Sequence, residues 1–406
     1  MRKNRLPYWE FIILVSIMFG MIAFGTDTVL PAFPEIAKDL ELLNVNKAQL
    51  IISSFILGTG VGQLISGPIS DTFGRKPIIT IGLIIFILAC IAAYYAETLE
   101  MMLVARFIQG LGISAPRTVT MALIRDLYSG RKMAQVMSLA MAIFVLVPAL
   151  APSIGQLLFV NFGWRSIYMA FIAFALIGLL WLNLRQPETL PFEQRKKFSS
   201  AEFLRAFKIV ITNSAVVKYT VTLALGFGAL FGYLNSAQQI FVDTLGAGMK
   251  FPMYFAIISI LAAPASFLNA ALVMKYGMKL LATIGFALQI IFAIITILII
   301  NQDFISMEWL LVIFISWSVI AFFLKGLYFG NLNALAMEPM GEIAGMASAI
   351  IGASATMLGI LIAIPIGLAF NGTATPVLFG YITFSSLALI LMLTKTNNNH
   401  RQYKNI

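Results

Sequence analysis

The stretch Gly67-Pro68-Ile69-Ser70-Asp71-Thr72-Phe73-Gly74-Arg75-Lys76-Pro77 decides the fold, because it sets turn-forming and charged residues between two long apolar blocks. The blocks cover residues 47–69 and 77–95. Gly74 permits a backbone angle that other residues avoid, and Asp71 can accept from amide groups at a helix start or pair with an arginine. We expect a tight polar turn that joins two helices. Its residues Gly67, Asp71, Gly74 and Arg75 are predicted to form a gate on one side of the molecule.

Outward from this turn, the whole chain consists of apolar blocks with short polar joints. Hydrophobic residues make up 60% of the 406 and charged residues 11%, against about 25% charged in a soluble domain. A helix of about 20 apolar residues crosses the ~30 Å hydrocarbon layer, and backbone groups in lipid must bond within the helix. We therefore predict an all-α polytopic membrane protein with twelve transmembrane helices, over residues 9–30, 47–69, 77–95, 101–123, 134–158, 164–184, 216–240, 252–273, 280–300, 309–332, 344–369 and 375–394.

The distribution of Lys and Arg orients these helices. Basic residues gather in the joints on the side of the N-terminus, while the opposite joints hold only Lys38, Lys47, Arg165 and Lys250. Cytoplasmic loops carry such an excess, so we expect a multi-pass protein of the cell inner membrane with both termini cytoplasmic. The excess of basic residues in the cytoplasmic loops then explains the net charge of +10, and we expect no nucleic-acid partner. Met1–Phe24 lacks a small-residue cleavage site and is interpreted as a retained first helix.

The longest polar joint divides the chain. We predict an N-terminal six-helix bundle over residues 1–185, a cytoplasmic linker over 186–213, a C-terminal six-helix bundle over 214–394 and a cytoplasmic tail over 395–406. Gly277 stands in a basic turn half a chain length after Gly74, at the equivalent joint of the second half. Related halves are common in secondary transporters, so this correspondence favours a duplicated fold.

Two ionisable residues lie inside the predicted helices at similar depth. Arg106 is about 8 Å from the outer start of its helix near Met101, and Asp27 is about 27 Å from the inner start near Trp9. Charges in a bilayer are costly and mark pathways or partners. We expect Asp27 and Arg106 to neutralise each other and to couple transport to a proton. The alternative is a solvated Asp27 in the external loop, with Arg106 reaching the headgroups.

Other unusual residues are candidates for the transport path. Pro148, Pro152 and Gly155 predict a bent, closely packed fifth helix suited to a gate between moving halves, or else a static kink. The polar and charged candidates for a substrate cavity are Gln63, Gln109, Arg117, Asn235, Gln238 and Lys325. Arg117 and Lys325 could instead extend to the cytoplasmic face. The uncharged candidates could instead form hydrogen bonds that hold neighbouring helices together.

The stretch 67–77 resembles the signature of the major facilitator superfamily between its second and third helices. Arg106, in Ala105-Arg106-Phe107-Ile108-Gln109-Gly110, resembles the arginine motif of the fourth helix, and Pro148 to Gly155 resembles, more loosely, the fifth-helix motif of exporters. More narrowly, the chain resembles the bicyclomycin-resistance (Bcr/CflA) family of multidrug:proton antiporters. This resemblance is carried by Thr26–Pro34, Ile124–Tyr128, Gly163-Trp164-Arg165, Pro187–Leu190, Glu338–Gly341 and Ala344-Gly345.

The resemblance implies two six-helix bundles, an inner-membrane location, proton-driven drug efflux and a role for Asp27 and Arg106 in coupling. The chain departs from the family at Met121, where an arginine is common, and it carries Arg117 one turn earlier; Lys325 is a further departure.

We therefore expect a proton-coupled transporter that exports drugs by alternating access of two bundles around a midplane site. The alternatives are an exporter of an endogenous metabolite or siderophore, a nutrient importer, or a membrane enzyme or receptor. We expect no enzyme activity and no cofactor beyond the proton gradient. One cysteine, Cys90, and one histidine, His400, predict no metal site. The expected partners are the lipid bilayer, a small-molecule substrate and protons, and we expect the chain to act as a monomer.

Overall fold

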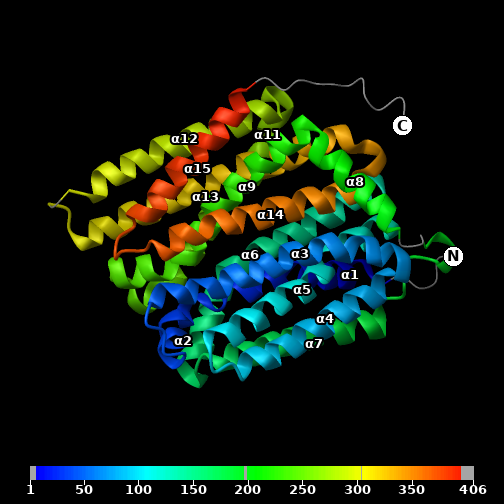
Figure 1. The fold of residues 1–406 in the computed structure, drawn as a ribbon, viewed down its shortest axis with the longest axis horizontal. Helices are drawn as coiled ribbons and strands as arrows, with labels where there is room; N and C mark the ends of the chain where they lie inside the picture. The colour runs from blue at the N-terminus through cyan, green and yellow to red at the C-terminus, as the bar shows by residue number, and fades with distance from the viewer. Residues whose placement is uncertain (1–5, 196–198, 303, 395–406) are drawn as a thin grey trace.

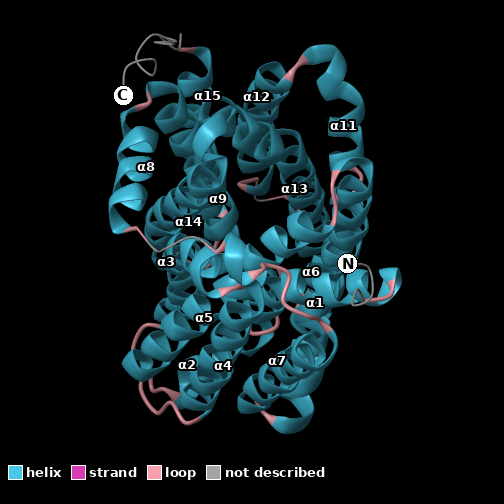
Figure 2. Cartoon of the chain, turned by 90° about the vertical axis from the view of Figure 1, so that its right-hand side faces the viewer, coloured by secondary structure: helices cyan, strands magenta, loops and turns pink. Residues whose placement is uncertain are grey.

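The computed structural model describes residues 6–195, 199–302 and 304–394, and within these ranges it contains helices and loops but no strand (Figure 2). Ten helical segments of the described chain are long and apolar enough to cross a membrane. The chain is therefore a multi-pass membrane protein. Two of the expected spans, 101–123 and 134–158, fall in helices outside this set. One of these helices carries Arg106 and Arg117, and the other contributes only the shorter apolar segment Leu146–Phe162.

The helices pack in two groups. The group called here the N-terminal bundle consists of α1 (Tyr8–Asp27), α3 (Leu50–Phe73), α4 (Arg75–Tyr94), α5 (Leu99–Leu127), α6 (Gly130–Phe162) and α7 (Arg165–Arg185). The C-terminal bundle consists of α9 (Ser214–Gln239), α10 (Phe251–Ala262), α11 (Ala265–Tyr276), α12 (Met278–Ile300), α13 (Met307–Met337), α14 (Ala344–Leu368) and α15 (Thr375–Leu393). Figure 1 shows the two groups side by side.

The same pattern of neighbours occurs in both bundles. Helix α4 packs on α7 as α12 packs on α15, and α1 packs on α6 as α9 packs on α14. Between the bundles, α3 packs on α14 and α6 packs on α10. The turns at Gly74 and Gly277 also correspond, because both glycines have positive φ, +107° and +79°, and end a helix by donating to the carbonyl four residues back. Backbone geometry thus repeats where the sequence repeats only weakly.

Three local features differ from simple apolar blocks. The segment expected to be one helix over 252–273 is divided at Pro264 into α10 and α11, because proline lacks the amide hydrogen that would continue the helix. Two short helices, α2 (Phe33–Asp39) and α8 (Ser200–Thr212), lie in segments where no span was expected. Helix α8 occupies the joint between the bundles and buries only Ala206 and Val210.

The two ends of the molecule are named here after these short helices. At the α2 end lie α2 and the 3-10 helix η2 (Val45–Gln49), together with the last residues of α14; at the α8 end, α1 begins and α15 ends (Figure 1). Hydrogen bonds between the bundles are confined to the α2 end among the described residues. They run from Asn46 to the carbonyls of Leu368 and Phe370, from Gln239 to Asn46, from Gln49 to Gln239, from Asn235 to Ser53, and from Gln156 to the carbonyl of Met249.

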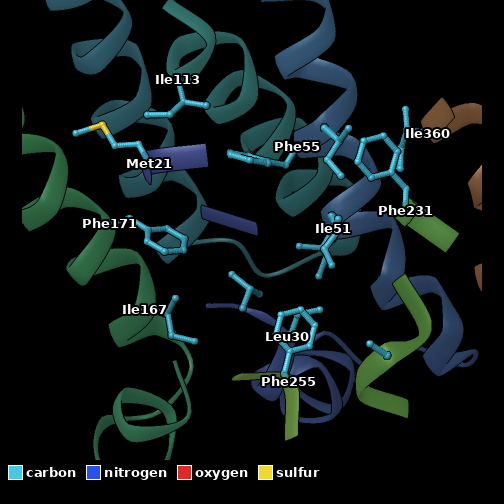
Figure 3. Packing of buried hydrophobic residues seen from close by; sticks show 14 of the residues in the cluster. Met21, Leu30, Ile51, Phe55, Ile113, Ile167, Phe171, Phe231, Phe255 and Ile360 are labelled. Carbon is cyan, nitrogen blue, oxygen red and sulfur yellow. The ribbon is translucent and has the colours of Figure 1, made fainter. Parts of the chain in front are cut away.

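An apolar cluster continues this contact toward the middle of the molecule. Ile51 and Phe55 of α3 belong to the same buried cluster as Phe231 of α9 and Ile360 of α14, and Figure 3 shows these four side chains near one another. The bundles are therefore joined by apolar packing and polar contacts from the α2 end to the middle.

Gly155 lets α6 approach α1 very closely. A Cβ atom built there lies 1.9 Å from the carbonyl oxygen of Thr28, so no larger residue fits without a shift of the backbone. We predict that Gly155→Ala lowers thermal stability by about 1–3 kcal/mol, the usual effect of overpacking. The matched change Gly330→Ala in α13 meets nothing within 4 Å and should be neutral or slightly stabilising. Melting temperatures of the purified variants test this, and equal values for the two variants would contradict it.

The amide contacts at the α2 end should hold that end closed. Each such hydrogen bond contributes about 0.5–1.5 kcal/mol. We predict that replacing both Gln49 and Gln239 by Ala lets the α2 end open in a measurable fraction of molecules. Spin labels at the exposed positions 47 and 373 report the separation of the two bundles there, and a longer-distance population is expected in the double variant.

The control for this measurement is Gln302→Ala, because the Gln302 side chain donates to the carbonyl of Leu298, in the helix that it follows within the same bundle. The single cysteine, Cys90, is buried and is replaced by Ser in every variant so that only the introduced cysteines are labelled. An unchanged distance distribution in the double variant would show that apolar packing alone holds the end closed.

Candidate functional site

A cavity of about 300 Å³ lies between the bundles, in the half of the molecule nearer the α8 end. Helices α3 and α5 form one wall, and α13 and α14 form the other. Small residues of α14, Gly345, Ala349 and Gly352, face the wall that carries the charged groups. A Cβ atom built at Gly345 meets nothing within 4 Å. The small residues therefore leave room for a ligand opposite α5.

The charged lining of this cavity is mainly basic. Arg75, Arg117 and Arg125 line it, and Asp71 is the one carboxylate among the described lining side chains. Asp71 pairs with Arg75. Arg117 and Arg125 are exposed and have no hydrogen bond or ion pair to another described residue. The cavity therefore presents two guanidinium groups that are free to meet a ligand.

The predicted gate turn lies at the mouth of the cavity and is tied to its own bundle. Arg75 binds Asp71, donates at 2.8 Å to Ser70 Oγ, and pairs at 3.0 Å with Asp126 at the end of α5. The Glu188 carboxylate accepts from the backbone amides of Arg75 and Lys76, both at 3.0 Å, and so caps the start of α4. Gly67, Asp71 and Arg75 line the cavity, so the turn can respond to what occupies it.

Arg106 is completely buried, and neutral groups satisfy it. Its Nη2 donates to the carbonyl of Gly25 at 2.8 Å, its Nη1 to Gln109 Oε1 at 2.8 Å, and its Nε to the carbonyl of Ile51 at 3.3 Å. Its guanidinium also lies over the Phe55 ring, 4.4 Å from the centroid. These bonds join α5 to α1 and α3. Arg106 does not extend to the headgroups, the alternative considered from the sequence.

Asp27, the last residue of α1, is buried at 6% exposure. It lies two residues beyond the Gly25 carbonyl that binds Arg106, and no hydrogen bond or ion pair joins it to another described residue. The structure thus brings Asp27 and Arg106 to the same level without an ion pair between them. Asp27 is not a solvated loop residue.

Four of the six cavity candidates lie elsewhere in this state. Gln109 is buried against Arg106 and donates to the carbonyl of Ala89. Asn235 belongs to the closure at the α2 end, and Gln238 is buried on the same helix. Gln63 and Arg117 do line the cavity. These candidates are buried because polar side chains in a helical membrane protein also form hydrogen bonds between helices.

Lys325 is the fourth candidate that does not line this cavity. It is buried in the C-terminal bundle, where its Nζ has no hydrogen-bond partner among the described residues and lies 3.6 Å from the centroid of the Phe322 ring. The Tyr381 and Tyr233 rings lie 5.3 and 5.8 Å away. Aromatic faces attract a cation, so these rings hold Lys325 away from both the cavity and the α8 end.

Sequence reasoning missed the partners that position these groups. Asp126 and Glu188 were noted only as parts of family motifs, yet they fix Arg75 and the turn. Gln49 closes the α2 end with Gln239, from which 190 positions separate it. No local pattern marks such distant pairs. The described residues contain no group of three or more His, Cys, Asp or Glu side chains that could hold a metal ion.

A second hollow, of about 450 Å³, lies within the N-terminal bundle between α3, α4 and α5. Its lining is apolar and includes the exposed residues Ile65, Phe73 and Ile81 on the outside of the bundle. It touches neither the charged residues nor the second bundle, so the cavity between the bundles is the better candidate site.

Comparisons with known proteins agree with this arrangement. The family model described as "Major Facilitator Superfamily" matches residues 15–364. A "Bicyclomycin resistance protein homolog" of Haemophilus influenzae is 30% identical over 96% of this chain and 98% of its own. The "Multidrug resistance protein MdtL" of Escherichia coli is 28% identical over 81% of each chain.

Solved structures support the fold alone. A crystal structure of a D-xylose-proton symporter matches with a TM-score of 0.75 at 16% identity, over 95% of this chain and 97% of that one. The human organic anion transporter MFSD10 matches with a TM-score of 0.62, also at 16% identity, over 96% and 99%. The fold, the turn motif and the relatives agree. The chain belongs to the major facilitator superfamily, and its relatives there include a protein named as a bicyclomycin resistance protein homolog.

Proposed function

We propose that this protein is a proton-coupled exporter of drugs or other small molecules that works by alternating access, as an antiporter and not as an enzyme. In this proposal α5 and α6 also cross the membrane, which makes twelve spans in two six-helix bundles joined by the linker 186–213. The protein acts as a monomer in the inner membrane with both termini in the cytoplasm. The relatives named for bicyclomycin and multidrug resistance support the export of drugs.

The observation that carries the proposal is the difference between the two ends. Contacts between the bundles close the α2 end, while a charged cavity lies toward the α8 end. Basic joints gather at the α8 end, and the positive-inside rule makes that end cytoplasmic. The arrangement is what an exporter needs when it collects a substrate from the cytoplasm.

Proton coupling is assigned to Asp27 and Arg106. A proton reaching Asp27 from outside neutralises its carboxylate, and Arg106 then keeps its neutral partners, the Gly25 carbonyl and Gln109. Loss of that proton creates a buried carboxylate two residues from the Gly25 carbonyl that binds Arg106. In this proposal the attraction between the carboxylate and the guanidinium favours a position of α1 in which the two are closer. The proton thereby binds the two states with different affinity, which coupling requires. The absence of an ion pair in the described state, which is closed at the α2 end, supports this order of events.

An exporter of an endogenous metabolite is the second candidate, because Arg117 adds a free cation to the cavity. A nutrient importer has no comparable support from a contact in the structure.

We expect drug addition to dissipate a proton gradient in inside-out vesicles that contain the wild-type protein. The panel starts with antibiotics and lipophilic cations and continues with amino acids and organic acids. With Asp27→Asn the drug-induced proton flux should fall to the level of vesicles without the protein, because Asn cannot carry the proton. Glu100→Gln is the matched control, since Glu100 is an exposed carboxylate in the first turn of α5. Undiminished flux in Asp27→Asn would refute the assigned coupling residue.

A further inference from the structure

Arg117 is placed where no topological rule requires a cation. Arg125 stands two residues from the end of α5 at the cytoplasmic side, where basic residues are expected. Arg117 lies two turns deeper, about 15 Å from that end of the helix. A guanidinium at this depth is costly unless it has a partner. The described structure offers it none, and its exposed surface lies in the cavity.

The surroundings of Arg117 suit a ligand that brings its own negative charge. The described carboxylate in the lining, Asp71, is already engaged by Arg75. Apart from Arg125, the remaining polar lining groups are neutral: Gln63 and Ser70 on α3, Thr118 on α5, Asn333 on α13 and Ser348 on α14. Such groups can orient a ligand but cannot neutralise a guanidinium. The arginine fork matches the two oxygens of a carboxylate in a bidentate pair.

We propose that the cavity binds organic monoanions, with the substrate carboxylate paired to Arg117. This inference rests on the proposed function and specifies the class of its substrate. We assign the one carboxylate to Arg117, because Arg117 lies deeper in the cavity and Arg125 lies about 12 Å further along the helix, toward its end. Met121 and Met346 provide adaptable apolar contacts for the rest of the molecule. The cavity volume of about 300 Å³ is enough for a small organic acid.

The test compares molecules that differ only in charge. Benzene, naphthalene, biphenyl and hexyl skeletons are each prepared as the carboxylate, the primary amide and the amidine, which have nearly the same shape. Equilibrium binding to the full chain in nanodiscs is measured for each. We expect the carboxylates to bind about tenfold or more tightly than their amides, since hydrogen bonds between charged groups are the strong ones. The amidines should bind more weakly still.

Variants connect this preference to Arg117. Arg117→Gln should abolish the preference for carboxylates, and Arg117→Lys should keep part of it, because lysine retains the charge without the planar fork. Arg131→Gln removes a cation at the start of α6, outside the cavity, and should leave the preference unchanged. Each variant is compared by its melting temperature, and the Lys variant keeps the test valid if Arg117→Gln fails to fold.

Three results would overturn the proposal. Amides or amidines could bind as well as every carboxylate, no carboxylate could bind better than its amide, or the preference could survive Arg117→Gln. The two proposals fail separately. Proton flux driven by neutral drugs and dependent on Asp27, without any carboxylate preference, leaves antiport standing and removes the anion site. Carboxylate binding through Arg117, without proton flux for any compound, leaves the site standing and removes antiport.

Discussion

A buried guanidinium must have its donors satisfied, and the arrangement of the N-terminal bundle follows from how Arg106 meets this requirement. Backbone carbonyls of α1 and α3 and the amide of Gln109 accept its hydrogen bonds, and Phe55 lies against its face. Arg106 therefore fixes the end of α1 relative to α3 and α5. The same contacts hold Gly25, two residues before the buried Asp27, against the guanidinium.

The fold was largely predictable from the sequence, since length and hydropathy define helices in lipid with little ambiguity. The turn at residues 67–77 and its position between two helices also followed from sequence alone. The break at Pro264 and the helix α8 were missed, because an apolar block does not reveal an interruption, nor a polar joint an amphipathic helix. The charged residues of α5 are the reason that hydropathy alone undervalues this helix as a span.

The site was predictable only in part. Depth along a helix follows from residue count, and it put Asp27 at a depth similar to that of Arg106, whose guanidinium binds the carbonyl of Gly25. The direction of a side chain did not follow, because both the lipid-facing and the inward-facing sides of α13 are apolar and leave no periodic signal for Lys325. Carbonyl partners such as Gly25 carry no side-chain signature at all. Arg117 was recognised by its charge. Its position in the cavity could not be predicted, because the small residues of α14 that form the opposite wall lie far away in the sequence.

The groups that hold the two bundles together at the α2 end are amides, a hydroxyl and peptide carbonyls. None of them changes its charge near neutral pH, and ionic strength hardly screens neutral dipoles. A seal of carboxylates and lysines in the same place would weaken whenever the medium turned acidic or saline. With an amide seal, neither the acidity nor the salinity of the medium at the α2 end changes the charge of the groups that hold the two bundles together there.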